Sequence, residues 1–354
     1  MMVYGHTVDA LLAEPYRVGR IYSAWQFQRG LTSCFFLLLS GFAFSITTSR
    51  HWQSHLQISP AFVKRVRRFG LFIILGYALH FPVRHFSDLP SASAELWRYF
   101  LTCDVLQLIG VAFISVQLLV LVTRTRARFT IAAFAIATLL VAATPALWSV
   151  DWTRFLPLWL ASYLSPTTGS AFPVVPWAAY VLIGAGIGQL YARWGAAHLR
   201  AFANRVLLAP GAVLIAAWYV VDAVAPFIYG TGPWNWVPAL FLLRLGACMV
   251  VLSLVAQASR WISRMPHAFG ALAQESLLVY FVHLLIVFGS IWNTGLATWY
   301  GRSLRPGQTF AVTIALLAAM TLLAWEWNRW KHVRPRAARW VSWAAGAWLI
   351  LALL

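Results

Sequence analysis

The chain has 354 residues, of which 61% are hydrophobic and 10% are charged. Soluble domains contain about 25% charged and roughly 45–50% apolar residues, so the composition excludes an ordinary water-soluble globule. The 27 lysines and arginines outnumber nine acidic residues, which gives a formal net charge of +18. An excess of this size points either to nucleic-acid binding or to the basic loops of a membrane protein.

Apolar segments of membrane-spanning length recur along the whole chain, and two of them, the second and the last, are short. They predict an all-α, polytopic transmembrane helix bundle, with residues 1–354 forming a single integral membrane domain. Residues 1–4 indicate the end of a further, truncated first span, and we expect its natural start about 20 residues upstream. The ten complete or nearly complete segments are 25–46, 69–83, 99–122, 129–148, 175–192, 207–226, 238–257, 277–298, 309–328 and 341–354.

The basic residues are concentrated in alternate loops between these segments. One set of loops holds eighteen of the 27 lysines and arginines, and the opposite set holds seven. The positive-inside rule places the richer set in the cytoplasm. The charge excess is therefore a signal of topology, and no nucleic-acid partner is expected. The cytoplasmic loops are then 47–68, 123–128, 193–206, 258–276 and 329–340.

Several polar or ionisable residues fall within or at the ends of the predicted spans. Such groups are costly in lipid, and by default each is a candidate for function. The alternative is structural: an ion pair at the interface, or a core histidine bonded to a carbonyl of a neighbouring helix. The residues are His6, Arg29, Asp104 with Gln107 one turn later, Asp222, Arg244, His283 and Glu326.

Motifs of soluble enzyme chemistry are missing from the sequence. It contains no Walker loop, HExxH, GxSxG or CxxC. The cysteines Cys34, Cys103 and Cys248 lie in apolar runs, where a thiol acts as a small hydrophobic group. Neither a metal site nor a disulfide framework is expected.

Five strings, taken in order, resemble the bacterial relatives of heparan-α-glucosaminide N-acetyltransferase, within the superfamily of transmembrane acyltransferases. They are MVYGHTVDALL at 2–12, RGL at 29–31 leading into FFLLLSGF at 35–42, DVLQLIG at 104–110, FPVVPWAAY at 172–180 and ESLLVYFVH at 275–283.

The resemblance implies an acyltransferase that moves an acyl group from cytoplasmic acyl-CoA, expected to be acetyl-CoA, to a sugar or glycan acceptor outside. It also implies a multi-pass protein of the bacterial inner membrane, whose partners are the lipid bilayer, the donor and the acceptor. A homo-oligomer is a further expectation. No permanently bound cofactor is expected.

The same resemblance suggests roles for individual residues. His6 matches the histidine at the end of the family's first helix and is our first choice for the base, with His283 in reserve. We expect Asp104 to orient His6 and Arg29 to polarise the thioester carbonyl. The donor phosphates are assigned to Lys64, Arg65, Arg67 and Arg68, although the topology of a cytoplasmic loop explains these residues equally well. Acceptor binding is assigned to Gln107, Arg244 and Trp177.

The sequence departs from the family pattern in two ways. The string that normally opens the first helix is missing, and residues 7–22 contain no histidine to carry an acetyl group. The second departure favours direct transfer over a covalent acetyl-histidine. Two other readings remain open: a transporter or flippase with an intramembrane Arg/Asp/His path, and a structural membrane protein.

Overall fold

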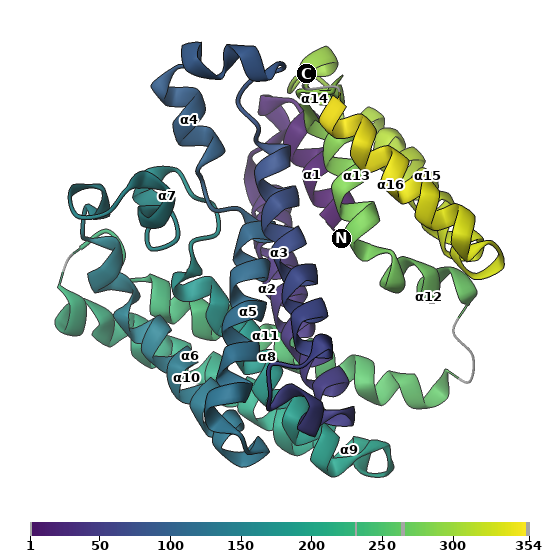
Figure 1. Ribbon diagram of the computed structural model, residues 1–354. Coiled ribbons are helices and arrows are strands. Elements are labelled where there is room, and N and C mark those ends of the chain that lie inside the picture. Colours follow the sequence, from purple (N-terminus) through teal and green to yellow (C-terminus); the bar gives the residue numbers. More distant parts are fainter. Residues whose placement is uncertain (1, 231, 263–265, 352–354) are drawn as a thin grey trace. The chain divides into compact units, whose positions relative to one another are not determined.

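The computed structural model describes residues 2–230, 232–262 and 266–351, and these residues are predominantly helical (Figure 1). The helices in chain order are α1 (Met2–Leu11), α2 (Gly19–Arg50), α3 (Pro60–Leu79), α4 (Ala94–Phe100), α5 (Val105–Thr123), α6 (Arg126–Trp148), α7 (Leu158–Ala161), α8 (Val174–Trp194), α9 (Leu199–Phe202), α10 (Ala209–Tyr229), α11 (Val237–Ala258), α12 (His267–Gln274), α13 (Ser276–Phe288), α14 (Leu296–Tyr300), α15 (Pro306–Val333) and α16 (Pro335–Leu351). A short hairpin, β1 (Gly289–Ser290) and β2 (Asn293–Thr294), follows α13.

The helices confirm a polytopic helical membrane protein. Among the described residues, seven helical stretches are long and apolar enough to cross a bilayer, and the pair α12 and α13, bent by 77°, provides an eighth if it is one span. Residues 69–79 of the predicted segment 69–83 lie on α3, which ends at Leu79, and residues 341–351 of the last predicted segment lie on α16. However, α3 carries four basic residues in its first half, and α16 has 17 described residues. Residues 352–354 of the last predicted segment lie outside the described residues.

The start of the predicted segment 99–122 is wrong. Helix α4 ends at Phe100, and α5 begins at Val105. Asp104 lies between them as the N-cap of α5, where its Oδ1 accepts a hydrogen bond from the Val105 backbone N–H at 2.7 Å. The backbone of Asp104 is extended, as is usual for an N-cap residue. Asp104 therefore does not lie within a helical span.

The end of the predicted segment 277–298 is also wrong. Helix α13 ends at Phe288 because Gly289 has a φ of +80°, which L side chains rarely adopt. A Cβ at Gly289 would also lie 2.6 Å from the Gly295 nitrogen across the hairpin. The apolar residues that follow form the hairpin and α14, so the span is shorter than its hydropathy indicates.

The described residues pack into two compact units. The first comprises residues 1–32, 79–97 and 262–354, and the second comprises residues 33–78 and 98–261. In the first unit, α1 packs against α13, α14 and α15 (Figure 1). Its core contains Leu11 of α1, Val287 of α13, and Leu316 and Met320 of α15. Apolar residues on α13, α14 and α15 therefore position the short helix α1.

The second unit contains the long apolar helices α5, α6, α8, α10 and α11, together with the second half of α2. Helices α2 and α8 approach closely at glycines. A Cβ at Gly184 would clash with the carbonyl oxygen of Leu38, and a Cβ at Gly41 would clash with that of Val181. Small residues at a helix interface are a common device in membranes, because association there depends on close backbone packing.

Candidate functional site

Two histidines from distant parts of the chain meet in the first unit. The Nδ1 of His6, on α1, lies 2.8 Å from the Nε2 of His283, on α13. Their rings are nearly parallel, with centroids 5.1 Å apart and planes inclined by 8°. His283 is completely buried, and His6 is half-buried. The two candidates that the sequence offered as alternatives for one role are therefore direct neighbours.

Aromatic side chains surround this pair. The rings of Tyr280 and Phe288 make edge contacts with the His6 ring at centroid distances of 6.4 and 5.7 Å. The Nδ1 of His283 lies 2.7 Å from the backbone carbonyl oxygen of Val279, one turn earlier on α13. The pair is thus held in an apolar environment in which electrostatic interactions are strong.

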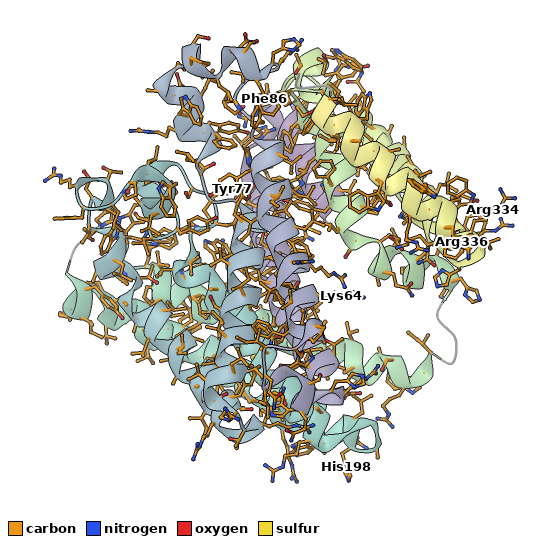
Figure 2. The ribbon with its side chains drawn as sticks, in the orientation of Figure 1. Lys64, Tyr77, Phe86, His198, Arg334 and Arg336 are labelled. Atoms are coloured by element: carbon orange, nitrogen blue, oxygen red, sulfur yellow. The ribbon has the colours of Figure 1, made fainter. Side chains whose placement is uncertain are left out.

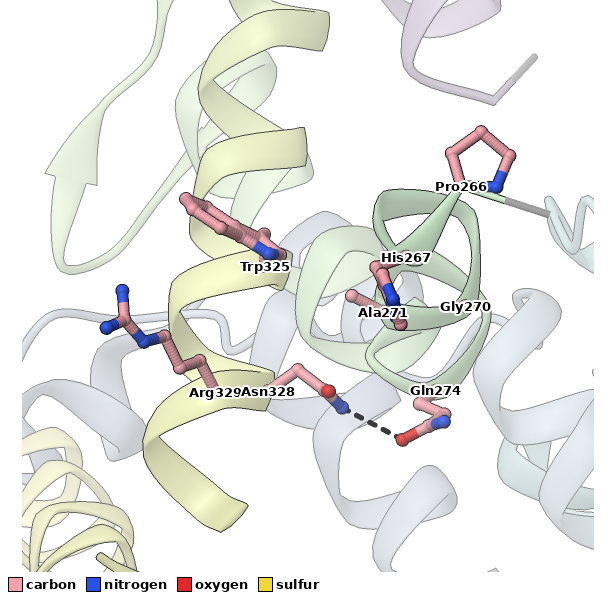
Figure 3. A pocket seen from close by; sticks show the side chains of 8 residues that line it. All are labelled: Pro266, His267, Gly270, Ala271, Gln274, Trp325, Asn328 and Arg329. Carbon is pink, nitrogen blue, oxygen red and sulfur yellow. Dashed lines mark hydrogen bonds between the residues drawn. The ribbon is translucent and has the colours of Figure 1, made fainter. Parts of the chain in front are cut away.

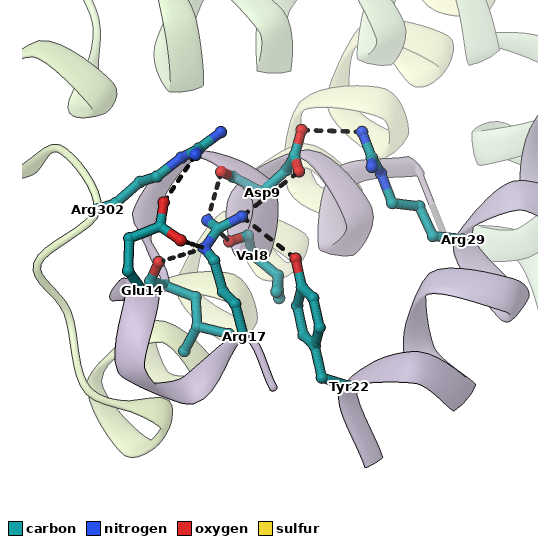
Figure 4. Close-up of polar contacts among 8 residues, drawn as sticks. Val8, Asp9, Glu14, Arg17, Tyr22, Arg29 and Arg302 are labelled. Carbon is teal, nitrogen blue, oxygen red and sulfur yellow. Dashed lines mark hydrogen bonds and ion pairs between the residues drawn. The ribbon is translucent and has the colours of Figure 1, made fainter. Parts of the chain in front are cut away.

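An ion pair between Asp9 of α1 and Arg29 of α2 lies near His6 (Figure 4). The Nη2 of Arg29 donates to the Oδ2 of Asp9 at 2.8 Å, and Asp9 follows His6 by one helical turn. The Arg29 side chain passes Gly5, where a Cβ would come within 3.6 Å of its Cγ. The Arg29 guanidinium also lies 5.7 Å from the centroid of the Trp25 ring. The structure therefore brings Arg29 beside the helix that carries His6.

Arg17 stabilises the end of the same helix. Its Nη2 donates to the Asp9 and Val8 carbonyls at 2.7 and 3.1 Å, and its Nε donates to the Leu12 carbonyl at 2.8 Å (Figure 4). A cation at a helix C-terminus satisfies carbonyls that have no intrahelical partner. Beyond it, the Nη1 of Arg302 donates to Glu14 at 2.8 Å. Neither Asp9 nor Arg17 is a candidate site residue from the sequence. The spacing of three residues between His6 and Asp9 does place both on one face of a helix.

The candidates for acceptor binding lie in the second unit. Gln107, on α5, is fully buried, and within the described part of the chain its Oε1 has no hydrogen-bond partner. Arg244, on α11, has a buried Nε that is likewise unpartnered among the described residues. Its charge acts on the buried residues Cys34 and Tyr180. Trp177, on α8, is half-buried and packs against Phe172 with a centroid distance of 4.8 Å.

The basic run at the start of α3 divides into two kinds of residue. Lys64, Arg67 and Arg68 are exposed, and Figure 2 shows Lys64 projecting from its helix. Arg65 is half-buried and donates to the Thr48 and Thr47 hydroxyls, both at 2.8 Å. Three of the four predicted phosphate contacts are therefore open to a ligand, whereas Arg65 joins α3 to α2.

Arg65 also lies beside His55, which belongs to the turn between α2 and α3. The Nη1 of Arg65 is 3.2 Å from the Nε2 of His55. Burial and then the positive charge of Arg65 lower the pKa of His55 below its ordinary value. His55 therefore stays neutral in conditions where an exposed histidine begins to take up a proton.

A separate cavity of about 320 Å³ lies between α12 and α15 (Figure 3). The Nδ2 of Asn328 joins the two helices by donating to the Gln274 Oε1 at 2.9 Å and to the Glu275 Oε1 at 3.0 Å. Glu275 is also paired with Lys331. None of the residues that line this cavity is a candidate site residue from the sequence. They are Pro266, His267, Gly270, Ala271, Gln274, Trp325, Asn328 and Arg329.

Metal-ligating side chains do not gather into a site in the described ranges 2–230, 232–262 and 266–351, where no three His, Cys, Asp or Glu side chains lie close enough to hold an ion. Cys34, Cys103 and Cys248 are buried, and none of these three described residues forms a disulfide.

The chain matches one family of known proteins over more than half of its length. No curated protein and no solved structure gives a significant match to this chain. The family model described as heparan-alpha-glucosaminide N-acetyltransferase, catalytic, matches residues 1–218, which is more than half of the chain. The matched region includes His6, Asp9 and Arg29. The chain therefore belongs to the heparan-alpha-glucosaminide N-acetyltransferase catalytic family.

Proposed function

We propose that the protein transfers an acetyl or other acyl group from cytoplasmic acyl-CoA to a sugar or glycan acceptor on the outer side of the membrane. The observation that carries the proposal is the His6–His283 pair in a membrane-spanning member of this family. An imidazole takes up and releases protons near neutral pH, which acyl transfer to an amine or hydroxyl requires. The paired rings offer that function beside the Arg29–Asp9 ion pair.

His6 is the base in this proposal. As the acceptor nitrogen or oxygen attacks the thioester carbonyl, a bond forms to the carbonyl carbon, and the acceptor's proton passes to His6. The tetrahedral intermediate then collapses, the carbon–sulfur bond breaks, and the CoA sulfur leaves as a thiolate. His6 returns the proton to that thiolate, so the enzyme ends unchanged.

Arg29 stabilises the developing negative charge on the carbonyl oxygen. Its ion pair with Asp9 supports this role, because a guanidinium that is already held beside α1 loses little freedom when the substrate binds. The pair is partly exposed, with 42% and 26% of the two side chains accessible. We expect it to contribute positioning more than stability.

The roles of the other candidate site residues belong to the same proposal. The exposed residues Lys64, Arg67 and Arg68 bind the donor phosphates, and Arg65 supports them from its buried position. Gln107, Arg244 and Trp177 bind the acceptor, supported by the unpartnered buried atoms of the first two and by the aromatic surface of the third. That Asp104 orients His6 stays a prediction.

The test is acceptor-dependent release of CoA from acetyl-CoA in proteoliposomes, with a panel of amino sugars and glycans. We expect His6→Gln to lower the turnover roughly 10²–10⁴-fold, the usual contribution of a general base, and to leave donor binding unchanged. Glutamine can still donate a hydrogen bond to His283, but it cannot take up a proton.

The matched control is His332→Gln, on α15. The Nδ1 of His332 lies 2.7 Å from the carbonyl of Asn328, one turn earlier, and His332 is exposed. We expect wild-type turnover from this variant. Wild-type turnover from His6→Gln would place the base elsewhere, and no CoA release from the wild type with any acceptor would favour a transporter.

A further inference from the structure

We infer that His283 is a positioning residue that fixes the tautomer of His6, leaving the Nε2 of His6 as the basic nitrogen. The inference rests on the proposed function and deepens it. It follows from a chain of hydrogen bonds that begins at a backbone carbonyl of α13 and passes through the His283 ring to the Nδ1 of His6. The remaining ring nitrogen of His6 is Nε2.

The chain begins at the backbone of α13. The Nδ1 of His283 faces the Val279 carbonyl oxygen at 2.7 Å. A carbonyl oxygen can only accept a hydrogen bond. The Nδ1 of His283 must therefore carry the proton, which is the usual way that a backbone carbonyl selects a histidine tautomer.

The second step concerns the contact between the rings. In neutral His283 a protonated Nδ1 leaves a lone pair on Nε2. That nitrogen lies 2.8 Å from the Nδ1 of His6, which is hydrogen-bond distance. The Nδ1 of His6 must then be the donor, so the proton of neutral His6 is on Nδ1 and its lone pair is on Nε2.

The surroundings favour two neutral rings in the resting state. His283 is completely buried, and an unpaired charge there would carry a large desolvation cost. The charge of Arg29 acts on His6, and Asp9, one turn after His6 on α1, is already paired with Arg29. Tyr280, on α13, and Phe288 complete the ring contacts.

This arrangement has a consequence for the proposed reaction. When the Nε2 of His6 takes the acceptor's proton, the Nδ1–H of the new imidazolium still faces the lone pair of His283. A hydrogen bond to a charged donor is stronger than one between neutral groups, so His283 stabilises the protonated base. The buried carboxylate of a serine-protease triad orients its histidine in a comparable way; here a neutral imidazole takes that place.

The first experiment observes the tautomer directly. We would label histidine with ¹⁵N in the full-length protein in lipid bilayers and record nitrogen spectra at neutral pH, assigning His6 and His283 by the signals lost in His6→Gln and His283→Gln. The inference requires a proton on Nδ1 and a bare Nε2 in both rings. A bare Nδ1 in His6 would overturn it.

The second experiment measures turnover in matched variants. His283→Gln keeps an acceptor oxygen near the position of Nε2, whereas His283→Leu removes it. We expect His283→Leu to lower turnover roughly 10²-fold, and His283→Gln to stay within about tenfold of wild type. His332→Gln, which alters another histidine bonded to a carbonyl one turn earlier, should change nothing.

The outcomes separate the inference from the proposed function. If wild-type protein releases no CoA, the proposed function fails, while the nitrogen spectra still decide the tautomer. If wild-type protein is active and His283→Gln is as impaired as His283→Leu, the acceptor role of His283 is wrong. Because the nitrogen spectra and their assignment do not use His283→Leu, poor folding of that variant cannot rescue or sink the inference.

Discussion

His55 is a buried histidine that faces a guanidinium, whereas His6 and His283 face each other. It is 7% exposed, its Nε2 faces the guanidinium of Arg65, and its Nδ1 is buried without a partner among the described residues. Protonation would place two positive charges side by side in a partly dry environment. Both effects oppose the charged form, and they explain why the pKa of His55 is lowered.

This environment predicts a dependence of stability on pH. The folded-state pKa of His55 lies below the unfolded value of about 6.5, so above that pH neither state binds the proton and His55 has no effect. As the pH falls below it, the unfolded chain takes up a proton that the folded protein refuses, and the free energy of unfolding decreases. We expect the apparent Tm in lipid nanodiscs to fall between pH 7.5 and 5.

The variant His55→Gln should flatten this dependence, because glutamine does not titrate. His198→Gln, which changes an exposed histidine in the turn that follows α8, should retain the wild-type slope. An unchanged slope in His55→Gln would assign the effect to another group.

At the scale of residues, the sequence identified single polar groups but not their pairing. His6 and His283 were both selected because ionisable residues in apolar segments are rare. Their contact joins positions 277 residues apart, and no local pattern encodes such a distance. Asp9 was overlooked because it lies next to a loop, where an acid needs no special explanation.

At the scale of elements, hydropathy located the long apolar helices well, because lipid permits little besides a continuous helix. It failed where a single residue ends a helix inside an apolar run. Asp104 caps α5, and Gly289 ends α13, although both positions fall inside a predicted apolar segment. Hydropathy averaged over a window cannot detect such positions, since one side chain or one φ angle decides them.

The contact between α2 and α8 gives a prediction about one helix pair. A Cβ at Gly184 would clash with the backbone of Leu38, which cannot move aside as a flexible side chain would. We expect Gly184→Ala to lower the stability by about 1–3 kcal/mol, the usual cost of overpacking. The apparent Tm in nanodiscs measures the change.

Gly70, on α3, provides the matched control. A Cβ there meets no atom within 4 Å among the described residues. Alanine is the better helix former by about 1 kcal/mol, so Gly70→Ala should leave the stability unchanged or raise it. Equal effects from the two substitutions would contradict the close packing of α2 on α8.

At the scale of the whole molecule, the proposed function requires a defined orientation in the membrane. The proposed donor, acyl-CoA, is cytoplasmic, and the proposed acceptor lies outside. The basic loops predict that residues 193–206 lie in the cytoplasm and residues 84–98 outside. The sequence alone makes this assignment, because the asymmetry of lysine and arginine between loops needs no tertiary structure.

Thiol labelling tests the orientation with little background, since the native cysteines Cys34, Cys103 and Cys248 are buried. Ser87→Cys and His198→Cys place one new thiol at an exposed position on each side. We expect a membrane-impermeant maleimide to label Ser87→Cys in intact cells, and His198→Cys only after the membrane is permeabilised. The reverse pattern would place Lys64, Arg67 and Arg68 outside, away from the CoA pool. Direct transfer from a cytoplasmic donor would then be untenable, because the phosphates of acyl-CoA could not reach the exposed basic run on α3 without crossing the bilayer.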